Sequence, residues 1–579
     1  MPSHPTHRVL SLSRLLILAA VLPTTALAQQ RASSPSARAG AAASGLPLKH
    51  DPRPTTAAIT AADLMTRLYV YADDSMLGRQ AGTENNTRAT AYIAAELRRL
   101  GLEPAGEGGT FFQDVPIVRR GYADSSVLVA GSERLTIWKD FAPANRRGVP
   151  RPLDEARVVF GGTYGDTAGA LSREQMKGKL VVFLPPGAAI AQAAMTRLRA
   201  ESPFAEAAGM AIVGLEQLPA ASLAVFRQPT LGLRAAASSA PPVPVSLIVT
   251  RRAAERLLGV PLEGARVGTT GRAVTGTLAL VETPAPARNV VALLRGRDPA
   301  LRGQYVAIGA HNDHVGFNRT PVDHDSLKAF NAAAWAMAGK YAGLPPLSRE
   351  RRASIVVNVD SLRRVAPPRP DSIANGADDD GSGSVAVLEI AEAMARAPQR
   401  PRRSVLFVWH TAEELGLLGS RWFTDHPTVP RDSIVAQINI DMIGRGGAAD
   451  TRGGGPDYLG LVGSRRLSSE LGDLVEAVNR AQRRPLAFDY GLDAKGHPEN
   501  IYCRSDHYNY ARYGIPIVFF FTGLHGDYHQ VTDEPQYIDY PHLERITRFI
   551  GDLTTRVANL PRRPVVDGEK PDPAGVCRQ

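Results

Sequence analysis

The sequence predicts a mainly parallel α/β sheet flanked by helices, with a smaller β-rich module inserted into the chain. Apolar runs at 305–310, 404–409 and 435–440 have the length and composition of strands buried on both faces. Each run ends beside a histidine or a carboxylate, and a helical pattern of apolar residues covers 385–397. Because ligands bind beyond the carboxyl ends of strands in an open α/β sheet, these side chains predict a site at one sheet edge.

Length and composition indicate a globular chain of several domains. The 579 residues suggest roughly two or three domains, and fractions of 44% hydrophobic and 21% charged residues exclude a disordered or collagen-like chain. The net charge of +10 is spread over separate arginine pairs, such as 98–99 and 351–352, and no basic block is interleaved with aromatic residues. This distribution favours a solvated basic surface, so we expect no nucleic-acid partner.

The first residues have the pattern of a secretory signal peptide, which we assign to 1–28. Basic residues precede the apolar run 15–22, and Ala26-Leu-Ala28 supplies a small-x-small cleavage site. Residues 29–60 begin with Ala, Ser, Pro and Arg and predict a flexible leader. No later apolar stretch approaches the ~20 residues of a membrane span. We therefore expect an exported protein without a membrane span, either periplasmic or secreted.

The remaining chain divides into a catalytic domain, an insert and a tail. The pattern over 83–100 predicts an amphipathic helix that Gly101 ends, and the run 289–294 predicts a strand that enters the catalytic sheet. Between them, short strands at 179–184, 210–213 and 243–249 alternate with Ala-rich segments, and Thr250 caps a short helix over 251–258. We interpret this module as a substrate-access or scaffold domain, with an inert insert as the alternative. The predicted domains are 61–124 with 285–560 (catalytic), 125–284 (insert) and 561–579 (tail).

The side chains at the strand ends form a candidate set for two zinc ions. Zinc binds His nitrogen and carboxylate oxygen, and a pair of zinc ions needs a carboxylate that both share. We assign His311 and Asp441 to one ion, Glu414 and His529 to the other, and Asp379 as the bridge. Glu413, next to a ligand but pointing elsewhere, remains as the general base for a bridging water. The set predicts hydrolysis of an amide bond.

Each of these motifs alone also has a plainer interpretation. A single His-x-Asp-His sequence is more often a polar turn, 378–380 is equally an acidic turn or helix cap, and Glu413-Glu414 is by default an exposed helix start. Asp441, in contrast, ends an apolar strand, where an unpaired carboxylate is costly to bury. The prediction therefore depends on the joint placement of the motifs.

Two cysteines, Cys503 and Cys577, are compatible with an oxidising compartment and with a disulfide between them. Nothing in the sequence brings them together, so two unpaired thiols are an equal alternative. Two cysteines exclude a Cys-rich zinc site and a disulfide scaffold.

The order of the motifs resembles the dizinc aminopeptidase family of zinc exopeptidases, which includes secreted bacterial aminopeptidases and plasma glutamate carboxypeptidases. The residues between 125 and 284 are similar in position and sequence character to the protease-associated domain of that family. The resemblance as a whole spans about 61 to 560. The motifs that carry it are Gly78-Arg-x-x-Gly82-Thr83, His311-x-Asp313, Gly376-Ala-Asp-Asp379-Asp-Gly-Ser-Gly383, Glu413-Glu414-Leu-Gly-Leu, Asn439-Ile-Asp441-Met, Ser505-Asp506-His507 and Tyr528-His529-x-x-x-Asp533.

The resemblance implies a fold of the zinc-exopeptidase type and two Zn²⁺ ions on the residues named above. It implies Asp379 as the bridge and Glu413 as the base, with Asp313 orienting His311 from behind. Ser505, Asp506 and His507 are expected to support the pocket.

Two departures from the family pattern stand out. Residues 318–374 lengthen the connection between His311 and Asp379, and within them 329–341 is predicted to be helical and 355–359 strand-like. We interpret this insertion as a lid or pocket wall, with a surface excursion as the alternative. The second departure is Glu534, where Thr is common. His525 also competes with His529 as a ligand, but the preceding tyrosine and the Asp four residues later favour His529.

These observations predict a secreted zinc-dependent exopeptidase that acts on peptides and releases N-terminal residues. The alternative within enzymes is a carboxypeptidase or dipeptidase with the same metal ions, and no motif decides between them. A non-catalytic binding protein of the same fold is the alternative from another class. The retention of all five ligand positions and of Glu413 argues against that alternative.

Overall fold

A computed structural model describes residues 46–145, 148–167, 169–186, 204–237, 242–340 and 347–579. The predicted signal peptide 1–28 and the first part of the predicted leader lie outside the described residues. Within the described ranges, no helix has the length and apolar content that crossing a bilayer requires.

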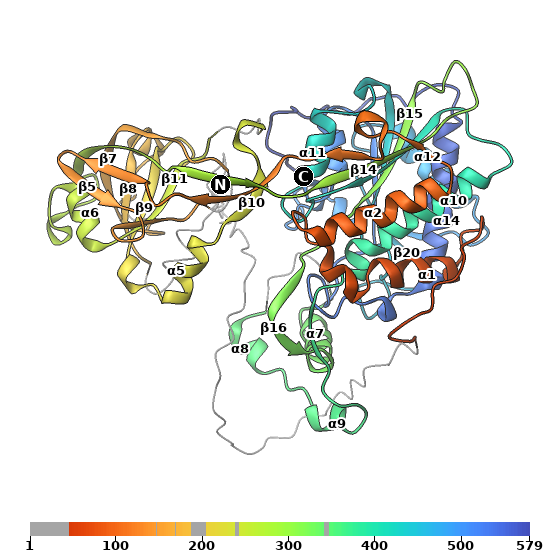
Figure 1. Cartoon of the computed structure of the whole chain (residues 1–579), viewed down its shortest axis with the longest axis horizontal. Helices are drawn as coiled ribbons and strands as arrows, with labels where there is room; N and C mark the ends of the chain where they lie inside the picture. The colour runs from red at the N-terminus through yellow and green to blue at the C-terminus, as the bar shows by residue number, and fades with distance from the viewer. Residues whose placement is uncertain (1–45, 146–147, 168, 187–203, 238–241, 341–346) are drawn as a thin grey trace, which may run out of the picture. The chain divides into compact units, whose positions relative to one another are not determined.

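The centre of the domain that is predicted to be catalytic is a mixed, mainly parallel sheet (Figure 1). Among the described residues it has nine strands, in the order β1-β14-β18-β15-β19-β22-β20-β21, with β2 also pairing with β14. The predicted fold class is thereby confirmed. The strands are β1 Glu103–Pro104, β2 Phe112–Asp114, β14 Arg288–Leu294, β15 Tyr305–His311, β18 Ser404–His410, β19 Ile434–Ile440, β20 Tyr458–Val462, β21 Ala487–Asp489 and β22 Ile517–Phe521.

The apolar runs of the sequence form the middle of this sheet. β15 pairs in parallel with β18 on one side and β19 on the other, and β22 runs parallel to β19. Their carboxyl ends therefore meet at one edge, where His311 lies opposite His410. β14 is antiparallel to β18, which makes the sheet mixed at that side.

Alternating side chains of these strands pack into cores on the two faces of the sheet. Val306, Ile308 and Ala310 of β15 belong to one core with helices that flank the sheet, and Ala307 belongs to the other. Since both faces are covered, almost every residue of the middle strands is apolar. One face carries α1 Ala61–Tyr71, α2 Glu84–Arg99, α10 Gly383–Arg396, α12 Ser469–Arg480 and α14 Tyr540–Ala558, and the other carries α11 Leu418–Asp425 and α13 His507–Ala511.

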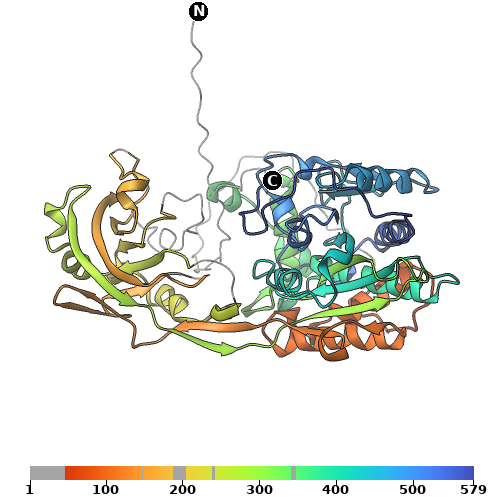
Figure 2. The same cartoon turned by 90° about the horizontal axis from the view of Figure 1, so that it is seen from above.

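The predicted β-rich insert forms a separate curved sheet (Figure 2). Among the described residues it has eight strands, in the order β5-β4-β12-β7-β8-β9-β11-β6. The Thr250 hydroxyl accepts a hydrogen bond from the backbone of Ala253, which confirms the predicted cap. The strands are β4 Val127–Ala130, β5 Glu133–Thr136, β6 Phe141–Pro143, β7 Leu153–Thr163, β8 Leu180–Leu184, β9 Gly209–Val213, β11 Val245–Val249 and β12 Thr270–Thr277, with helices α3 Arg173–Met176, α5 Ala220–Arg227 and α6 Arg251–Leu258.

A small three-stranded sheet connects the chain before and after the insert. It consists of β10 Thr230–Leu233, β3 Ile117–Tyr122 and β13 Leu280–Pro284, in that order. Both crossings between the domains thus run side by side as antiparallel strands.

The insertion at 318–374 forms a two-stranded ribbon and short helices. Its elements are β16 Phe317–Asp323, α7 His324–Met337, α8 Arg349–Ala353, α9 Val359–Arg363 and β17 Pro370–Ile373, with β16 paired to β17. The predicted helix over 329–341 corresponds to α7, which begins five residues earlier and already ends at Met337; residue 341 lies outside the described part. The predicted strand at 355–359 is wrong. Val356 is 89% exposed, and no strand pairs with this stretch within the described residues, so its apolar side chains have no sheet to join.

Both ends of the described chain are held against the catalytic domain. In the part of the predicted leader that is described, the Tyr69 hydroxyl donates to Pro47 and the Thr55 hydroxyl donates to Glu392. At the other end, a disulfide joins Cys503 to Cys577 in the tail. Of the two alternatives that the sequence left open, the structure has the bonded one.

Candidate metal centre

The acidic turn before α10 holds three aspartates in different directions. It is a wide turn, Ala377–Ser382, that follows Gly376, and the peptide bond between Asp379 and Asp380 is cis. Asp378 accepts a hydrogen bond from the backbone of Gly444, and Asp380 accepts one from the backbone of His311. The two outer carboxylates thus fasten the turn to neighbouring strand ends. The middle one, Asp379, remains free to face the site.

Buried polar groups fix the position of this turn. Asp533 accepts hydrogen bonds from the backbone nitrogens of Asp378 and Asp379, at 3.0 and 3.1 Å. Arg79, from the Gly78-Arg79 motif, is fully buried and donates to the carbonyls of Asn375 and Gly376 at 2.6 and 2.9 Å. A side chain at Gly376 would meet the Asp379 carbonyl at 2.3 Å, and its φ of +56° also favours glycine.

The first group of candidate ligands is His311, Asp379 and Asp441. His311 Nε2 lies 3.1 Å from Asp379 Oδ1 and 3.6 Å from Asp441 Oδ1. All three side chains are buried at the carboxyl ends of β15 and β19 or in the acidic turn. The three donor atoms lie within 4.8 Å of one another, which fits a single small cation.

The second group shares Asp379 through its other oxygen. Asp379 Oδ2 lies 3.1 Å from His529 Nε2 and 3.6 Å from His314 Nδ1. Glu414 contacts both imidazoles, with Oε2 at 3.0 Å from His529 and Oε1 at 2.9 Å from His314. The five residues predicted from the strand ends therefore lie together, and Asp379 stands between two groups.

The donor atoms fit cations better than they fit each other. His311 Nε2, His529 Nε2, Asp379 Oδ2 and Glu414 Oε1 are buried and make no hydrogen bond among the described residues. Buried polar atoms without partners are unfavourable by about 1–3 kcal/mol each. Imidazole nitrogen and carboxylate oxygen are donors that zinc prefers, so the residues present fit two zinc ions.

Charge interactions inside the centre are strong. Burial lowers the pKa of His311, but the carboxylates of Asp441 and Asp379 outweigh it and hold that pKa well above its usual value. Burial also lowers the pKa of His529, but the carboxylates of Glu414 and Asp379 outweigh it and raise this pKa to about 10. Because an imidazole must be deprotonated to bind a metal ion, we expect the metal affinity of the centre to depend on pH.

Glu413 lies among the other carboxylates of the centre. Burial raises the pKa of Glu413 well above its usual value; His311 opposes this, while Glu414, Asp441 and Asp506 add to it. Its backbone nitrogen donates to Asp313 Oδ1 at 3.0 Å. A carboxylate whose pKa is raised is suited to accept and return a proton.

Asp313 supports the site by a different contact than expected. His311 Nδ1 lies 3.0 Å from the backbone carbonyl of Asp313, and the Asp313 carboxylate is farther away, at 3.8 Å. That carboxylate instead accepts a hydrogen bond from the Glu413 backbone. Asp313 therefore connects the segment that carries His311 to the segment that carries Glu413.

The motif at 505–507 contributes three different contacts. The Ser505 hydroxyl donates to Asp441 Oδ2 at 2.7 Å, and Asp506 Oδ2 lies 3.4 Å from His410 Nδ1. The His507 ring stacks on Phe519 with centroids 4.6 Å apart, and burial lowers its pKa to about 3. Ser505 therefore orients Asp441 directly, whereas His507 supports the core beneath the sheet edge.

Three residues of the centre were not assigned from the sequence. His314 faces Glu414 although only His311 was chosen from the His-x-Asp-His run. Tyr528 stacks on His529 with ring centroids 3.8 Å apart, and Arg504 lies 3.4 Å from the Tyr528 hydroxyl. The second imidazole of the run and the tyrosine before His529 were visible signals. His525 contacts Asp378 at 3.2 Å, as a neighbour of the acidic turn.

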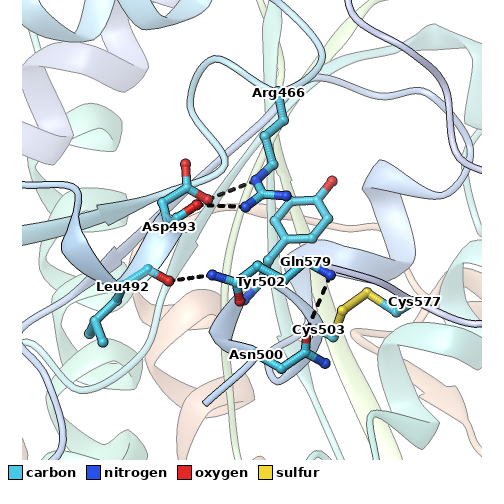
Figure 3. The surroundings of a disulfide bond; sticks show 8 residues. All are labelled: Arg466, Leu492, Asp493, Asn500, Tyr502, Cys503, Cys577 and Gln579. Atoms are coloured by element: carbon cyan, nitrogen blue, oxygen red, sulfur yellow. Dashed lines mark hydrogen bonds and ion pairs between the residues drawn. A yellow bond between two sulfur atoms is a disulfide. The ribbon is translucent and has the colours of Figure 1, made fainter. Parts of the chain in front are cut away.

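The tail fastens the segment that leads into Arg504 and Ser505 (Figure 3). Besides the disulfide, the Gln579 side chain donates to the carbonyl of Leu492, and its backbone nitrogen donates to Asn500 Oδ1. The Arg466 guanidinium lies 4.2 Å from the Tyr502 ring centroid and contacts Asp493. The chain just before the site is thus held at several points.

Comparison with known families identifies the catalytic domain. Residues 289–554 match the family described as Peptidase family M28. Residues 289–554 therefore form an M28 peptidase domain. The matched range contains every candidate metal ligand and Glu413, and it ends inside α14.

Curated relatives of this chain include a leupeptin-inactivating enzyme and a leucine aminopeptidase. Leupeptin-inactivating enzyme 1 of Streptomyces exfoliatus is 46% identical over 77 residues, which cover 13% of this chain and 18% of that protein. Leucine aminopeptidase 1 of Paracoccidioides brasiliensis (strain Pb18) is 28% identical over 243 residues, which cover 40% of this chain and 58% of that protein. The chain spans less than two thirds of the length of both relatives.

Solved structures similar to this chain include an aminopeptidase from Aneurinibacillus sp. strain AM-1, with a TM-score of 0.44 and 17% identity over 89% of this chain and 97% of that one. A zinc aminopeptidase from Bacillus subtilis has a TM-score of 0.42 and 15% identity over 89% of this chain and 99% of that one.

Proposed function

We propose that this chain is an exported zinc-dependent aminopeptidase that releases N-terminal residues from peptides. The observation that supports this most is the position of Asp379, whose two oxygens face separate groups of imidazole and carboxylate donors. In this proposal His311 and Asp441 bind one zinc ion, Glu414 and His529 bind the other, and Asp379 bridges them. His314 contributes as a further ligand or as the partner that orients Glu414.

The charge of the centre favours a substrate with a free amine. The carboxylates of Asp379, Glu413, Glu414 and Asp441 match the charge of two zinc ions, and the carboxylate of the buried Asp506 adds negative charge behind them. A positively charged α-amino group is attracted to such a pocket, whereas a substrate carboxylate is repelled. The similarity to leucine aminopeptidases agrees with this preference.

The residues of the chain have separate roles in hydrolysis. Zinc, when bound, lowers the pKa of a coordinated water and polarises the scissile carbonyl. Glu413 accepts the proton of the attacking water on its carboxylate and then delivers it to the nitrogen of the leaving amine. The Tyr528 hydroxyl donates a hydrogen bond to the negative charge that develops on the carbonyl oxygen. Burial raises the pKa of Tyr528 well above its usual value, so this hydroxyl keeps its proton.

Replacing Glu413 by Gln tests the proposed base. This substitution keeps the size of the side chain but removes its ability to accept a proton, so kcat falls by about 10²–10⁴-fold. Zinc content, measured by elemental analysis on the same samples, stays at the wild-type level. Full activity of the variant contradicts the role of Glu413.

A second candidate, a carboxypeptidase or dipeptidase, is favoured by Arg504. Its guanidinium lies beside Tyr528 and near Glu413, where it offers a cation to a substrate carboxylate, although Glu499 contacts it at 2.7 Å. Aminoacyl anilides, N-blocked peptides and C-terminally amidated peptides separate the alternatives. Hydrolysis of the anilides and of amidated peptides supports an aminopeptidase, and hydrolysis of N-blocked peptides supports a carboxypeptidase.

We also propose the domain division predicted above, with a catalytic domain of 61–124 and 285–560 and a protease-associated-like insert at 125–284. Export is supported by the disulfide between Cys503 and Cys577, because such bonds persist in oxidising compartments.

A further inference from the structure

A third group of metal-binding side chains lies where the 318–374 insertion meets the catalytic domain. It consists of His324 at the start of α7, Asp371 in β17 and Glu534, which follows Asp533. One donor atom from each lies within 4.8 Å of the others. Glu534 is the position where the sequence departs from the family pattern, in which Thr is common. A role as a metal ligand in this group would explain why a carboxylate stands there.

The two carboxylates of this group make no direct ion pair with a lysine or arginine within the part of the chain that the structure describes. Glu534 is only 9% exposed, and its closest polar contact is a weak one, from the Asn375 amide at 3.4 Å. Among the described residues, no lysine or arginine nitrogen lies within 4.0 Å of Glu534 or Asp371. Arg369 contacts Asp325 and the Tyr537 hydroxyl instead. Burial, Asp371 and Asp74 raise the pKa of Glu534 to about 8 against the opposing charge of Arg369, so a cation bound here would displace a proton.

The geometry also supplies a nitrogen donor. His324 is fully buried, with Nδ1 at 2.7 Å from Asp371 Oδ2 and Nε2 at 3.3 Å from the Tyr537 hydroxyl. The β16–β17 ribbon brings the two insertion residues together, because Asp323 pairs with Pro370 in the register. Ligand atoms on one tetrahedral zinc lie about 3.3 Å apart, so a small opening of the His324–Asp371 pair admits the ion.

We propose that His324, Asp371 and Glu534 form a third zinc site, separate from the catalytic pair. One imidazole and two carboxylates favour zinc over calcium or magnesium, which prefer oxygen ligands only. The site fastens the insertion to the segment whose Asp533 holds the acidic turn in place. The bound ion is structural, and its presence does not depend on peptidase activity.

The number of zinc ions in the purified full chain tests this proposal. The chain is loaded with zinc, separated from free metal by gel filtration and analysed for zinc per chain. We expect three ions in the wild type and two in Glu534→Gln and in His324→Gln. Glu350→Gln, the same change on the exposed surface of α8 in this insertion, is the control and keeps three.

Thermal unfolding with and without added zinc provides a second readout. The wild type and Glu350→Gln gain stability from the third equivalent of zinc, and Glu534→Gln does not. Two ions in the wild type, or three in both Glu534→Gln and His324→Gln, overturn the proposal even if one variant folds poorly. A His311→Ala/His529→Ala variant that still binds one zinc distinguishes this site from the catalytic pair. Displacement of the third ion by millimolar calcium overturns the assignment to zinc.

Discussion

Replacing Asp527 by Asn tests how the insertion is anchored beside the candidate metal centre. Asp527 lies two residues before His529, is 3% exposed, and its carboxylate contacts Lys328 of α7 and Arg445, the latter at 3.2 Å. The Thr532 hydroxyl donates to the other oxygen at 2.7 Å. The substitution keeps the shape of the side chain and removes the carboxylate that Lys328 contacts, while Arg445 keeps its contact with Asp450 at 2.5 Å. Breaking a buried pair in this way costs about 3–5 kcal/mol.

The pKa of Asp527 gives an independent magnitude. Burial raises this pKa, but Arg445 and Lys328 outweigh it and lower it to about 2, from 3.8. The shift corresponds to about 2.4 kcal/mol of stability at neutral pH. Because the folded-state pKa is depressed, this stability is present above pH 3.8 and is lost as the pH falls toward 2. About half of it is lost by pH 3.

Lys328 provides the matched comparison. Burial and repulsion from Arg445 lower the pKa of Lys328 despite the attraction of Asp527, because the carboxylate is shared between two cations. Lys328→Met leaves the contact between Asp527 and Arg445 intact, so it is expected to cost less than Asp527→Asn.

Urea unfolding from pH 7 to pH 3 measures both variants against the wild type. The difference in free energy of unfolding between wild type and Asp527→Asn is expected to be largest at pH 7 and to narrow toward pH 3. A variant within about 0.5 kcal/mol of the wild type at pH 7, or a difference that does not change with pH, refutes the anchoring role.

Three further predictions concern other contacts of the fold. Cys503→Ser, or reduction of the disulfide, lowers the free energy of unfolding by about 2–5 kcal/mol and lowers kcat/KM, since Arg504 follows directly; equal values with and without reductant contradict this. His314→Ala weakens zinc binding by about 10–100-fold, and added zinc restores activity; unchanged affinity in a competition with a chelator rules out contact with the metal site. Arg67→Met leaves Glu389 buried without its cation and is expected to lower the free energy of unfolding by about 3–5 kcal/mol. Arg99→Met, at a more exposed ion pair, is expected to lower it by less than about 1 kcal/mol. Equal losses of stability in chemical unfolding contradict the argument that burial makes the Arg67 contact the stronger one.

The strand ends of the catalytic sheet were predictable because burial leaves a strong pattern in the sequence. The run 305–310 is apolar throughout since both of its faces are covered, and the first polar residue after it, His311, marks the sheet edge. The same reasoning placed Asp441 after β19. His314 was missed because the pattern shows where a strand ends, but not which of two nearby imidazoles turns toward the site.

The stretch at 355–359 shows the limit of that pattern. Its residues have the composition of a strand, but a strand also needs a neighbour with unpaired backbone groups, and the sequence does not show whether one is near. The disulfide presents the same difficulty, because Cys503 and Cys577 are 74 residues apart and meet only through the path of the tail.

The contacts of Glu534 depend on three separate features of the fold. Glu534 directly follows Asp533, whose carboxylate accepts hydrogen bonds from the backbone of the acidic turn. These contacts fix the position of Glu534 relative to Asp379. The position of Asp371 follows from the register of β16 and β17, and that of His324 from the start of α7. No local pattern in the sequence relates these features to one another. An insertion that brought only carboxylates to this point would add charge repulsion beside the catalytic turn; an imidazole at the same point allows a cation to remove it.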